Sequence, residues 1–299
     1  MKLIKSVFLV GGTHGNELTG INLVKHCQKN QINNRYSSFD LDYFLANSKA
    51  IKENQRYIDI DLNRCFKLTD LSDDSLQGYE SILAKKINQQ IGPKGNSKTD
   101  FIIDLHTSTA NMQTNIVITK IDRFHLQLAA YLKHKLDKVV ITSEVDLMDD
   151  HHFLNSIADK RIVIEIGSIP QGCIEYPIYQ LTQNALLASL DFVDMYNREI
   201  DYDFPDTIEI MSYYEKIKFP LDKSGSISAS VHPSLIGKAY PVIEKGTPIF
   251  ISFDGEDILY EGEKTQAAFI NEAAYYDQSI AMCLCRPRKF SLSGGLPVD

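Results

Sequence analysis

A short hydrophobic run followed by glycine opens the chain. Ser6 to Val10 (SVFLV) is apolar and partly β-branched, and Gly11-Gly12 ends it, so we predict a buried strand here. From Leu18 to Lys29, apolar residues recur at the spacing of an amphipathic helix. A strand, a glycine-rich turn and a helix in this order are the opening unit of an α/β domain.

Strand and helix patterns continue to alternate up to about residue 205. The expected strands are 39–46, 101–105, 115–119, 139–143 and 161–167, and the expected helices are 75–91, 123–136 and 180–197. After Phe204-Pro205, short β-like runs alternate with turn sequences, a pattern that is typical of a small, mostly β domain. We therefore predict two domains, residues 1–205 and residues 206–299.

Charge and composition narrow the classes of function. The net charge of −8 disfavours a nucleic-acid partner or binding to an anionic membrane surface. No apolar run approaches the roughly 18 residues of a membrane helix, and five scattered cysteines do not make a secreted disulfide framework. We expect a cytoplasmic protein that binds neither nucleic acid nor membrane.

The first candidate site follows the first expected strand directly. His14 and Glu17 stand three residues apart, just past the end of the strand, where α/β proteins place their sites. An imidazole nitrogen and a carboxylate oxygen together suit Zn²⁺, and the pair would supply two of the three ligands in a catalytic site. A surface histidine beside a helix start would show the same spacing.

A second histidine follows another buried strand. His106 comes one residue after the expected strand 101–105 and lies far along the chain from Glu17. Two ligands close together and a distant third, with a fourth position left for water, is the arrangement of catalytic zinc. Asp104 could then hold the second imidazole nitrogen. The alternative is a packed histidine with ordinary hydrogen bonds.

Two arginines mark a third candidate site. Arg56 and Arg64 are separated by eight positions, and Asn63 and Asp61 lie between them. A guanidinium group binds a carboxylate through two parallel hydrogen bonds, to which Asn63 can add a third. Asp61 could orient one of the arginines. A local surface cluster of salt bridges is the competing interpretation.

Glu165 lies inside the apolar run RIVIEIG, between two isoleucines. A buried carboxylate without a partner is costly, so Glu165 must be paired, protonated or close to a metal. Beside zinc it would suit a general base for water. The alternative, a glutamate on an edge strand, is disfavoured because apolar and polar residues do not alternate around it.

A fifth stretch, Phe269 to Tyr276 (FINEAAYY), lies in the expected β domain. A tyrosine hydroxyl here could reach a substrate carboxylate, and Glu272 could brace the loop. By composition alone these residues also fit a core of aromatic side chains.

Taken together, these stretches resemble the aspartoacylase family of the zinc carboxypeptidase-like superfamily. The similar segments are GGTHGNELTG, RYIDIDLNR, IIDLHTSTANM, IEIG with the following PQG, and FINEAAYY. The resemblance implies a zinc-carboxypeptidase-like α/β domain, with a mixed, largely parallel sheet flanked by helices. A smaller, mostly β domain would lie over the site. One zinc ion per chain would be held by His14, Glu17 and His106.

The resemblance also assigns roles to the remaining candidates. Glu165 would act as general base and acid, and Arg56 would stabilise the tetrahedral oxyanion. Asn63, Arg64 and Tyr275 would hold the α-carboxylate of the substrate. The implied reaction is the zinc-dependent hydrolysis of the amide bond of an N-acyl-L-aspartate. With N-acetyl-L-aspartate as the substrate, the products are acetate and L-aspartate. The resemblance also implies a homodimer.

The chain departs from this pattern where cations are expected to bind the aspartate side chain. Asn155 replaces an arginine, and Gln278 and Ser279 replace paired lysines. His151 or His152, if protonated, could substitute in part. These departures leave a broader deacylase of neutral or aromatic N-acetyl amino acids as an alternative. A non-catalytic protein that binds zinc or carboxylates is an alternative of another class.

Overall fold

The computed structural model describes residues 2–145, 150–293 and 297–298. Residues 294–296 and 299 of the predicted second domain lie outside the described residues. Six strands belong to the first predicted domain: β1 (Ser6–Gly11), β2 (Asp40–Leu45), β3 (Phe101–Ser108), β4 (Gln113–Ile118), β5 (Val139–Ser143) and β6 (Lys160–Gly167). Its helices are α1 (Leu18–Lys29), α2 (Ser48–Glu53), α3 (Leu68–Ser72), α4 (Tyr79–Ile91), α5 (Arg123–Lys135) and α6 (Tyr176–Asn197). Short 3₁₀ turns are η1 (Ile32–Arg35), η2 (Leu62–Arg64) and η4 (Leu154–Ile157).

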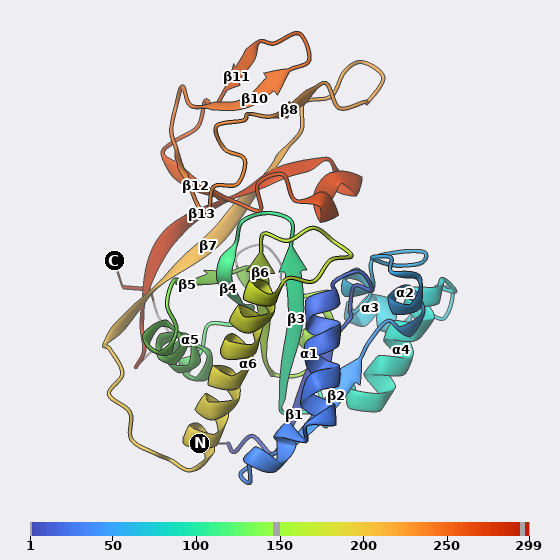
Figure 1. Ribbon diagram of the computed structural model, residues 1–299, viewed down its shortest axis with the longest axis vertical. Helices are drawn as coiled ribbons and strands as arrows, with labels where there is room; N and C mark the ends of the chain where they lie inside the picture. Colours follow the sequence, from blue (N-terminus) through green and yellow to red (C-terminus); the bar gives the residue numbers. More distant parts are fainter. Residues whose placement is uncertain (1, 146–149, 294–296, 299) are drawn as a thin grey trace.

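The second part of the chain is almost entirely β. Its strands are β7 (Thr207–Lys218), β8 (Ala229–Val231), β9 (Val242–Ile243), β10 (Pro248–Ser252), β11 (Asp257–Leu259), β12 (Thr265–Ala268) and β13 (Ile280–Ser291), and its 3₁₀ turn is η5 (Ala273–Gln278). The long strands β7 and β13 pair antiparallel, whereas β8, β10 and β11 form a separate small sheet at the far end of the molecule (Figure 1).

A ten-stranded sheet runs through the molecule in the order β2-β1-β3-β6-β4-β5-β7-β13-β12-β9. The pairs β1–β2, β1–β3, β3–β6, β4–β5 and β5–β7 are parallel, and only β4 runs against β6 in the first domain's described strands. The sheet is therefore mixed and largely parallel, as predicted. The predicted boundary at residues 205 and 206 falls in the link between α6 and β7.

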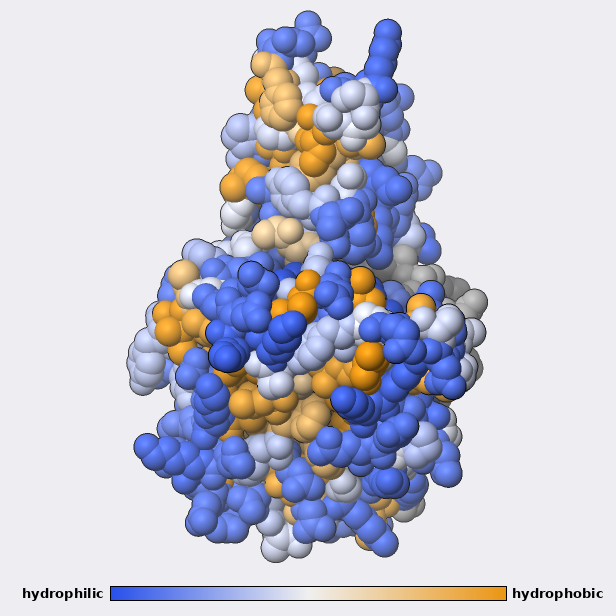
Figure 2. Space-filling view, turned by 90° about the vertical axis from the view of Figure 1, so that its right-hand side faces the viewer, coloured by the Kyte–Doolittle hydropathy of each residue, from blue (hydrophilic) through white to orange (hydrophobic). Residues whose placement is uncertain are grey.

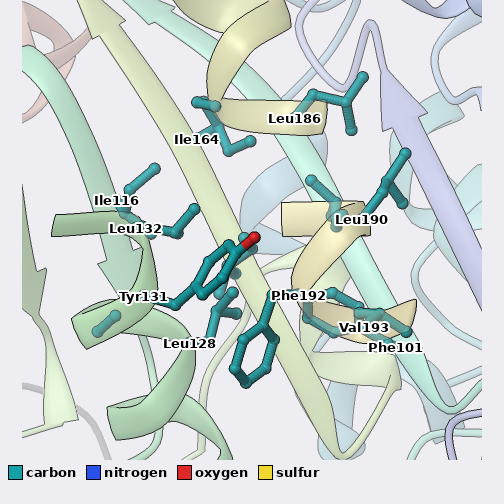
Figure 3. Close-up of a cluster of buried hydrophobic side chains, with 14 of the residues drawn as sticks. Phe101, Ile116, Leu128, Tyr131, Leu132, Ile164, Leu186, Leu190, Phe192 and Val193 are labelled. Atoms are coloured by element: carbon teal, nitrogen blue, oxygen red, sulfur yellow. The ribbon is translucent and has the colours of Figure 1, made fainter. Parts of the chain in front are cut away.

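Helices cover both faces of this sheet because successive strand residues point to opposite sides. Leu9 and Ile103 pack with α1 and α6 on one face, whereas Val10 and Ile102 pack with α4 on the other. Figure 3 shows the first of these cores, where Leu128 and other side chains of α5 face the side chains of α6 over the strands.

The long strand β13 is the main element that the hydrophobic pattern does not indicate. Its first half, Ile280 to Cys285, is buried, but Arg286, Pro287 and Arg288 interrupt the apolar run. Pairing with β7 continues through this interruption, because Pro287 lies opposite Met211 in the register. Tertiary pairing thus extends a strand beyond the segment that its own sequence favours.

The outer surface agrees with the acidic, polar composition. Figure 2 shows one face as largely hydrophilic, with hydrophobic residues in the narrow upper part of the view and across the lower, wider part. No helix of the described residues is both long enough and apolar enough to cross a membrane.

Candidate active site and metal centre

The parallel pairing of β1 and β3 brings the first two motifs together. Gly11 at the end of β1 lies opposite Leu105 of β3, so the turn after β1 approaches His106. Gly15 is required in this turn, because a Cβ atom there would lie 2.1 Å from the Ala50 backbone. The close approach to α2 places His14 and Glu17 against His106, and all three side chains are buried.

The ligand atoms of His14, Glu17 and His106 lie within 4.8 Å of one another. Glu17 Oε1 is 2.6 Å from Nδ1 of His14, and Oε2 is 3.0 Å from Nδ1 of His106. The two Nδ1 atoms are 3.1 Å apart. Both imidazoles therefore face the same point, beside a carboxylate.

A further carboxylate lies within ion-pair distance of the opposite nitrogen of each imidazole. Asp61 Oδ1 is 2.9 Å from Nε2 of His14, and Asp104 Oδ2 is 3.0 Å from Nε2 of His106. The hydroxyl of Thr13 donates to the other oxygen of Asp104 at 2.9 Å. A carboxylate beside Nε2 favours the tautomer with its proton there, which leaves a lone pair on Nδ1.

This donor set fits zinc. Two imidazole Nδ1 atoms and the Glu17 carboxylate converge on one point, where neutral imidazoles would present lone pairs to a cation. Burial raises the pKa of Glu17, but the two histidines outweigh burial and hold the pKa below its usual value, so Glu17 is ionised. Two imidazoles and one carboxylate are a ligand set of catalytic zinc.

Arg56 belongs to the same cluster. Its guanidinium donates to Glu17 Oε1 at 3.2 Å and to Asp61 Oδ2 at 3.0 Å. Asp61 therefore orients Arg56, as expected from the sequence, and also contacts His14. Burial lowers the pKa of Arg56, but Asp61 and Glu17 more than compensate, so the guanidinium remains charged.

A buried glutamate that sequence reasoning missed shapes the segment between the two arginines. Glu80, in the first turn of α4, accepts hydrogen bonds from the backbone N–H groups of Ile58, Asp59 and Ile60, at 2.7 to 3.3 Å. The side chain of Asn47 donates to it at 3.1 Å. Glu80 thus fixes the path of the loop from Arg56 to η2.

Glu165 lies on β6, beside the candidate metal centre. The register pairs it with His106 on β3. Burial raises the pKa of Glu165 to about 8, with His106 and Arg56 lowering it and Glu17 and Glu272 raising it. A carboxylate whose pKa is raised in this way can both take up and return a proton near neutral pH.

Glu272 ties the second domain to the end of β3. Its Oε2 accepts hydrogen bonds from the hydroxyl of Ser108 and from the N–H of Ala110, and its Oε1 accepts the N–H of Ala274 at 3.1 Å. The expectation that Glu272 braces its loop is confirmed. The brace holds η5, which carries Tyr275, against the first domain.

The structure brings the candidates for carboxylate binding to one end of the site. Asn63 is buried, and its Oδ1 accepts the N–H of Leu154 at 2.8 Å. The Arg64 guanidinium lies 5.6 Å from the centre of the Phe153 ring, and in the described chain no carboxylate forms an ion pair with it. Burial, Cys283 and Glu144 raise the pKa of Tyr275 and Arg64 lowers it, so Tyr275 is within electrostatic reach of Arg64.

The hypothesis that a histidine supplies the missing cation is wrong. Burial, with Arg161 and Lys94 nearby, lowers the pKa of His151 to about 4. Burial and Arg64 lower the pKa of His152 to about 3. Both histidines are therefore neutral at pH 7.

Two residues that the sequence did not indicate lie at this end. Lys216, exposed on β7, lowers the pKa of Glu144 and of His152, which places its charge near both. Glu144 follows β5 and is buried, and its Oε2 has no hydrogen-bond partner among the described residues. Burial raises the pKa of Glu144. No short motif marks either residue.

The three departures from the family pattern also differ in their surroundings. Asn155 is fully buried in η4, and neither polar atom of its side chain has a partner in the part of the chain that the structure describes. Gln278 is exposed, and Ser279, just after η5, is half-buried. The described structure therefore leaves Asn155 as an unsatisfied amide.

Comparison with known proteins agrees with this architecture. Residues 3–193 match the succinylglutamate desuccinylase/aspartoacylase catalytic domain, and residues 206–287 match the AstE/AspA barrel-sandwich hybrid domain. A protein of Trichodesmium erythraeum (strain IMS101) named "Probable aspartoacylase" is 40% identical over 96% of this chain and 98% of its own. An N-acyl-aromatic-L-amino acid amidohydrolase (carboxylate-forming) of Xenopus laevis is 38% identical over 93% of both chains. The crystal structure of murine aminoacylase 3 has a TM-score of 0.91 at 32% identity and covers 98% of both chains.

Fold and sequence similarity together define a hydrolase. The chain belongs to the succinylglutamate desuccinylase/aspartoacylase family. The predicted family, the predicted fold class and the prediction of an enzyme are confirmed. The bound zinc, the roles of the site residues and the homodimer stay predictions.

Proposed function

We propose that the protein is a zinc-dependent deacylase that hydrolyses N-acetyl-L-aspartate to acetate and L-aspartate. The observation that carries this proposal is the convergence of two Nδ1 atoms and a carboxylate, with Glu165 beside them in the sheet. His14, Glu17 and His106 would hold one zinc ion per chain. When bound, zinc would polarise the acyl carbonyl and lower the pKa of water.

The residues of the chain account for the remaining steps. Glu165 takes a proton from the attacking water, whose oxygen adds to the acyl carbon. Arg56 stabilises the negative charge that develops on the carbonyl oxygen, which is usually a large contribution to catalysis. Glu165 then returns the proton to the amide nitrogen, the C–N bond breaks, and a carboxylate and a free amino acid are formed.

Binding of the amino acid rests on the opposite end of the site. Arg64 has no carboxylate partner of its own in the described structure, and Asn63 and Tyr275 lie near it. These residues would bind the α-carboxylate of the substrate. Lys216 would offer a positive charge for the side-chain carboxylate of aspartate, in place of the cations that Asn155, Gln278 and Ser279 replace.

A broader deacylase of neutral or aromatic N-acetyl amino acids is the second candidate. The neutral Asn155 favours it, and relatives with similar identity carry either kind of name. A non-catalytic protein that binds zinc or carboxylates is disfavoured because Glu165 and Arg56 both lie beside the metal centre.

Metal analysis combined with a substrate panel tests the proposal. The purified protein should contain about one zinc per chain and should hydrolyse N-acetyl-L-aspartate faster than N-acetyl-leucine or N-acetyl-phenylalanine. A preference for the neutral substrates would support the second candidate instead. A zinc-loaded protein that hydrolyses no member of the panel would contradict both.

The remaining proposals concern organisation and location. We propose domains at 1–205 and 206–299, a homodimer and a cytoplasmic location, from the sequence pattern and the family resemblance. Light scattering on the purified protein tests the homodimer, and a monomeric mass would contradict it. Cell fractionation tests the location.

A further inference from the structure

The strands β3, β6 and β4 are neighbours in the sheet at the active site (Figure 1). The register pairs His106 of β3 with Glu165 of β6, and Glu165 in turn with Asn115 of β4. Paired residues on antiparallel strands point to the same face of the sheet, with Cβ atoms roughly 4.5–5.5 Å apart. Glu165 therefore lies between a candidate zinc ligand and the side chain of Asn115.

Asn115 is a polar residue in an apolar position. Its side chain is fully buried, and Ile116 and Val117 follow it in the core of β4. The hydroxyl of Thr142 on β5 donates to Oδ1 of Asn115 at 2.9 Å, which orients the amide group. The Nδ2 atom has no acceptor among the described residues. A buried donor without an acceptor destabilises the fold, so packing alone would favour an apolar side chain here.

The carboxylate of Glu165 is the complementary group beside this donor. Within the described ranges, no residue donates a hydrogen bond to Glu165, and part of its side chain remains open to solvent. Its register neighbours are His106 on one side and Asn115 on the other. The Asn115 amide and the Glu165 carboxylate thus project from the same face of neighbouring strands, and no hydrogen bond joins them in the structure.

We infer that Asn115 is a positioning residue, whose Nδ2 donates a hydrogen bond to the Glu165 carboxylate and holds it for proton transfer. This inference rests on the proposed function, in which Glu165 is the base. A general base works only when its oxygen is held within hydrogen-bond distance of the proton that it takes. Arg64, Asn63 and Tyr275, which would bind the substrate, are separate from Asn115.

The substitution Asn115→Leu tests this role, because leucine has a similar volume but no donor. We expect kcat for the best substrate of the panel to fall on the order of tenfold to a hundredfold, and KM to change less than about twofold. The reason is that the carboxylate loses its orientation while the binding residues stay in place. A KM that rises as much as kcat falls would overturn the inference.

A double-mutant cycle separates positioning from a packing defect. Glu165→Asp withdraws the carboxylate by one methylene group, beyond the reach of Asn115, while keeping a base. In that background Asn115→Leu should reduce kcat by less than about twofold, because the hydrogen bond is already absent. A packing defect would reduce kcat by the same factor in both backgrounds, and this result would overturn the inference.

Thr142→Val provides a second variant if Asn115→Leu does not fold. It keeps the volume of Thr142 but removes the hydroxyl that orients Asn115, so kcat should fall severalfold with KM unchanged. Thr114→Val is the matched control. Thr114 is buried next to Asn115 on β4, but its side chain points to the opposite face of the sheet. Equal kcat values in these two variants would overturn the inference while leaving the proposed function intact. An inactive wild-type enzyme would overturn both.

Discussion

The metal end of the active site, around His14, Glu17 and His106, and the recognition end, around Arg64 and Glu144, differ in the ion pairs that their charged side chains form. At the metal end, Asp61 contacts His14, Arg56 and the Asn63 backbone. At the recognition end, Glu144 Oε2 and both polar atoms of Asn155 have no partner within the described residues. The comparison teaches that ion pairs preorganise the candidate zinc ligands, whereas Glu144 and Arg64 at the recognition end have no ion-pair partner in the described chain.

The largest effect is expected when two of the three candidate zinc ligands are removed. The double variant His14→Ala, His106→Ala should lose its zinc and its hydrolytic activity down to the background, because only Glu17 of the three ligands remains. Metal analysis and turnover of both proteins check this outcome. The prediction fails if the double variant retains about one zinc per chain.

A second variant leaves the metal ligands in place and removes the base. Glu165→Gln should lower kcat by about 10²- to 10⁴-fold, because glutamine cannot take up a proton from water. Zinc content should stay at the wild-type level. Glu144→Gln is the matched control, since it makes the same change at the recognition end, and its kcat should fall far less. Unchanged hydrolysis in Glu165→Gln would show that another group is the base.

At the recognition end the expected effects are on binding. Arg64→Gln should raise KM on the order of tenfold to a hundredfold, because a charge-assisted hydrogen bond to the α-carboxylate contributes about 1.5–3 kcal/mol. The effect should be the same for aspartate, leucine and phenylalanine substrates, which share that carboxylate. Steady-state kinetics on the panel measure it, and a KM that changes for only one substrate would contradict the role.

Lys216 sharpens the comparison because, in the proposed function, it would affect the binding of the aspartate substrate alone. Lys216→Met should lower kcat/KM for N-acetyl-L-aspartate by about tenfold or less and leave N-acetyl-leucine unchanged, because the lysine is exposed and its attraction is screened. Lys218→Met, on the same strand, is the control. Equal losses for both substrates would exclude a role in reading the side chain.

The smallest expected effect concerns stability at acidic pH. His151 and His152 have folded-state pKa values of about 4 and about 3, below the unfolded value near 6.5. The unfolded chain therefore binds more protons below pH 6.5, so stability should fall as pH decreases from 6.5 toward 4. Between pH 6.5 and pH 4, the melting temperature of His151→Asn should fall by a few degrees less than that of the wild type. Parallel melting curves would contradict this prediction.

The sequence indicated the metal end far better than the recognition end. His14, Glu17 and Glu165 each lie in a short motif at or in a buried strand, so local pattern and topology suffice to place them together. Lys216 and Glu144 come from distant segments, and only packing of β7 beside β5 brings them close. The charge of His151 and His152 depends on burial, which no local motif records.

The parallel pairing of β5 with β7 means that the sheet does not end where the catalytic domain does. A chain cut in the link after α6 would expose the edge of β5, with unpaired backbone groups that favour aggregation. The cut would also separate η5 from the first domain, to which Glu272 ties it through the N–H of Ala110. The two domains are thus best regarded as one cooperative folding unit, in which assembly of the active site and completion of the sheet are the same event.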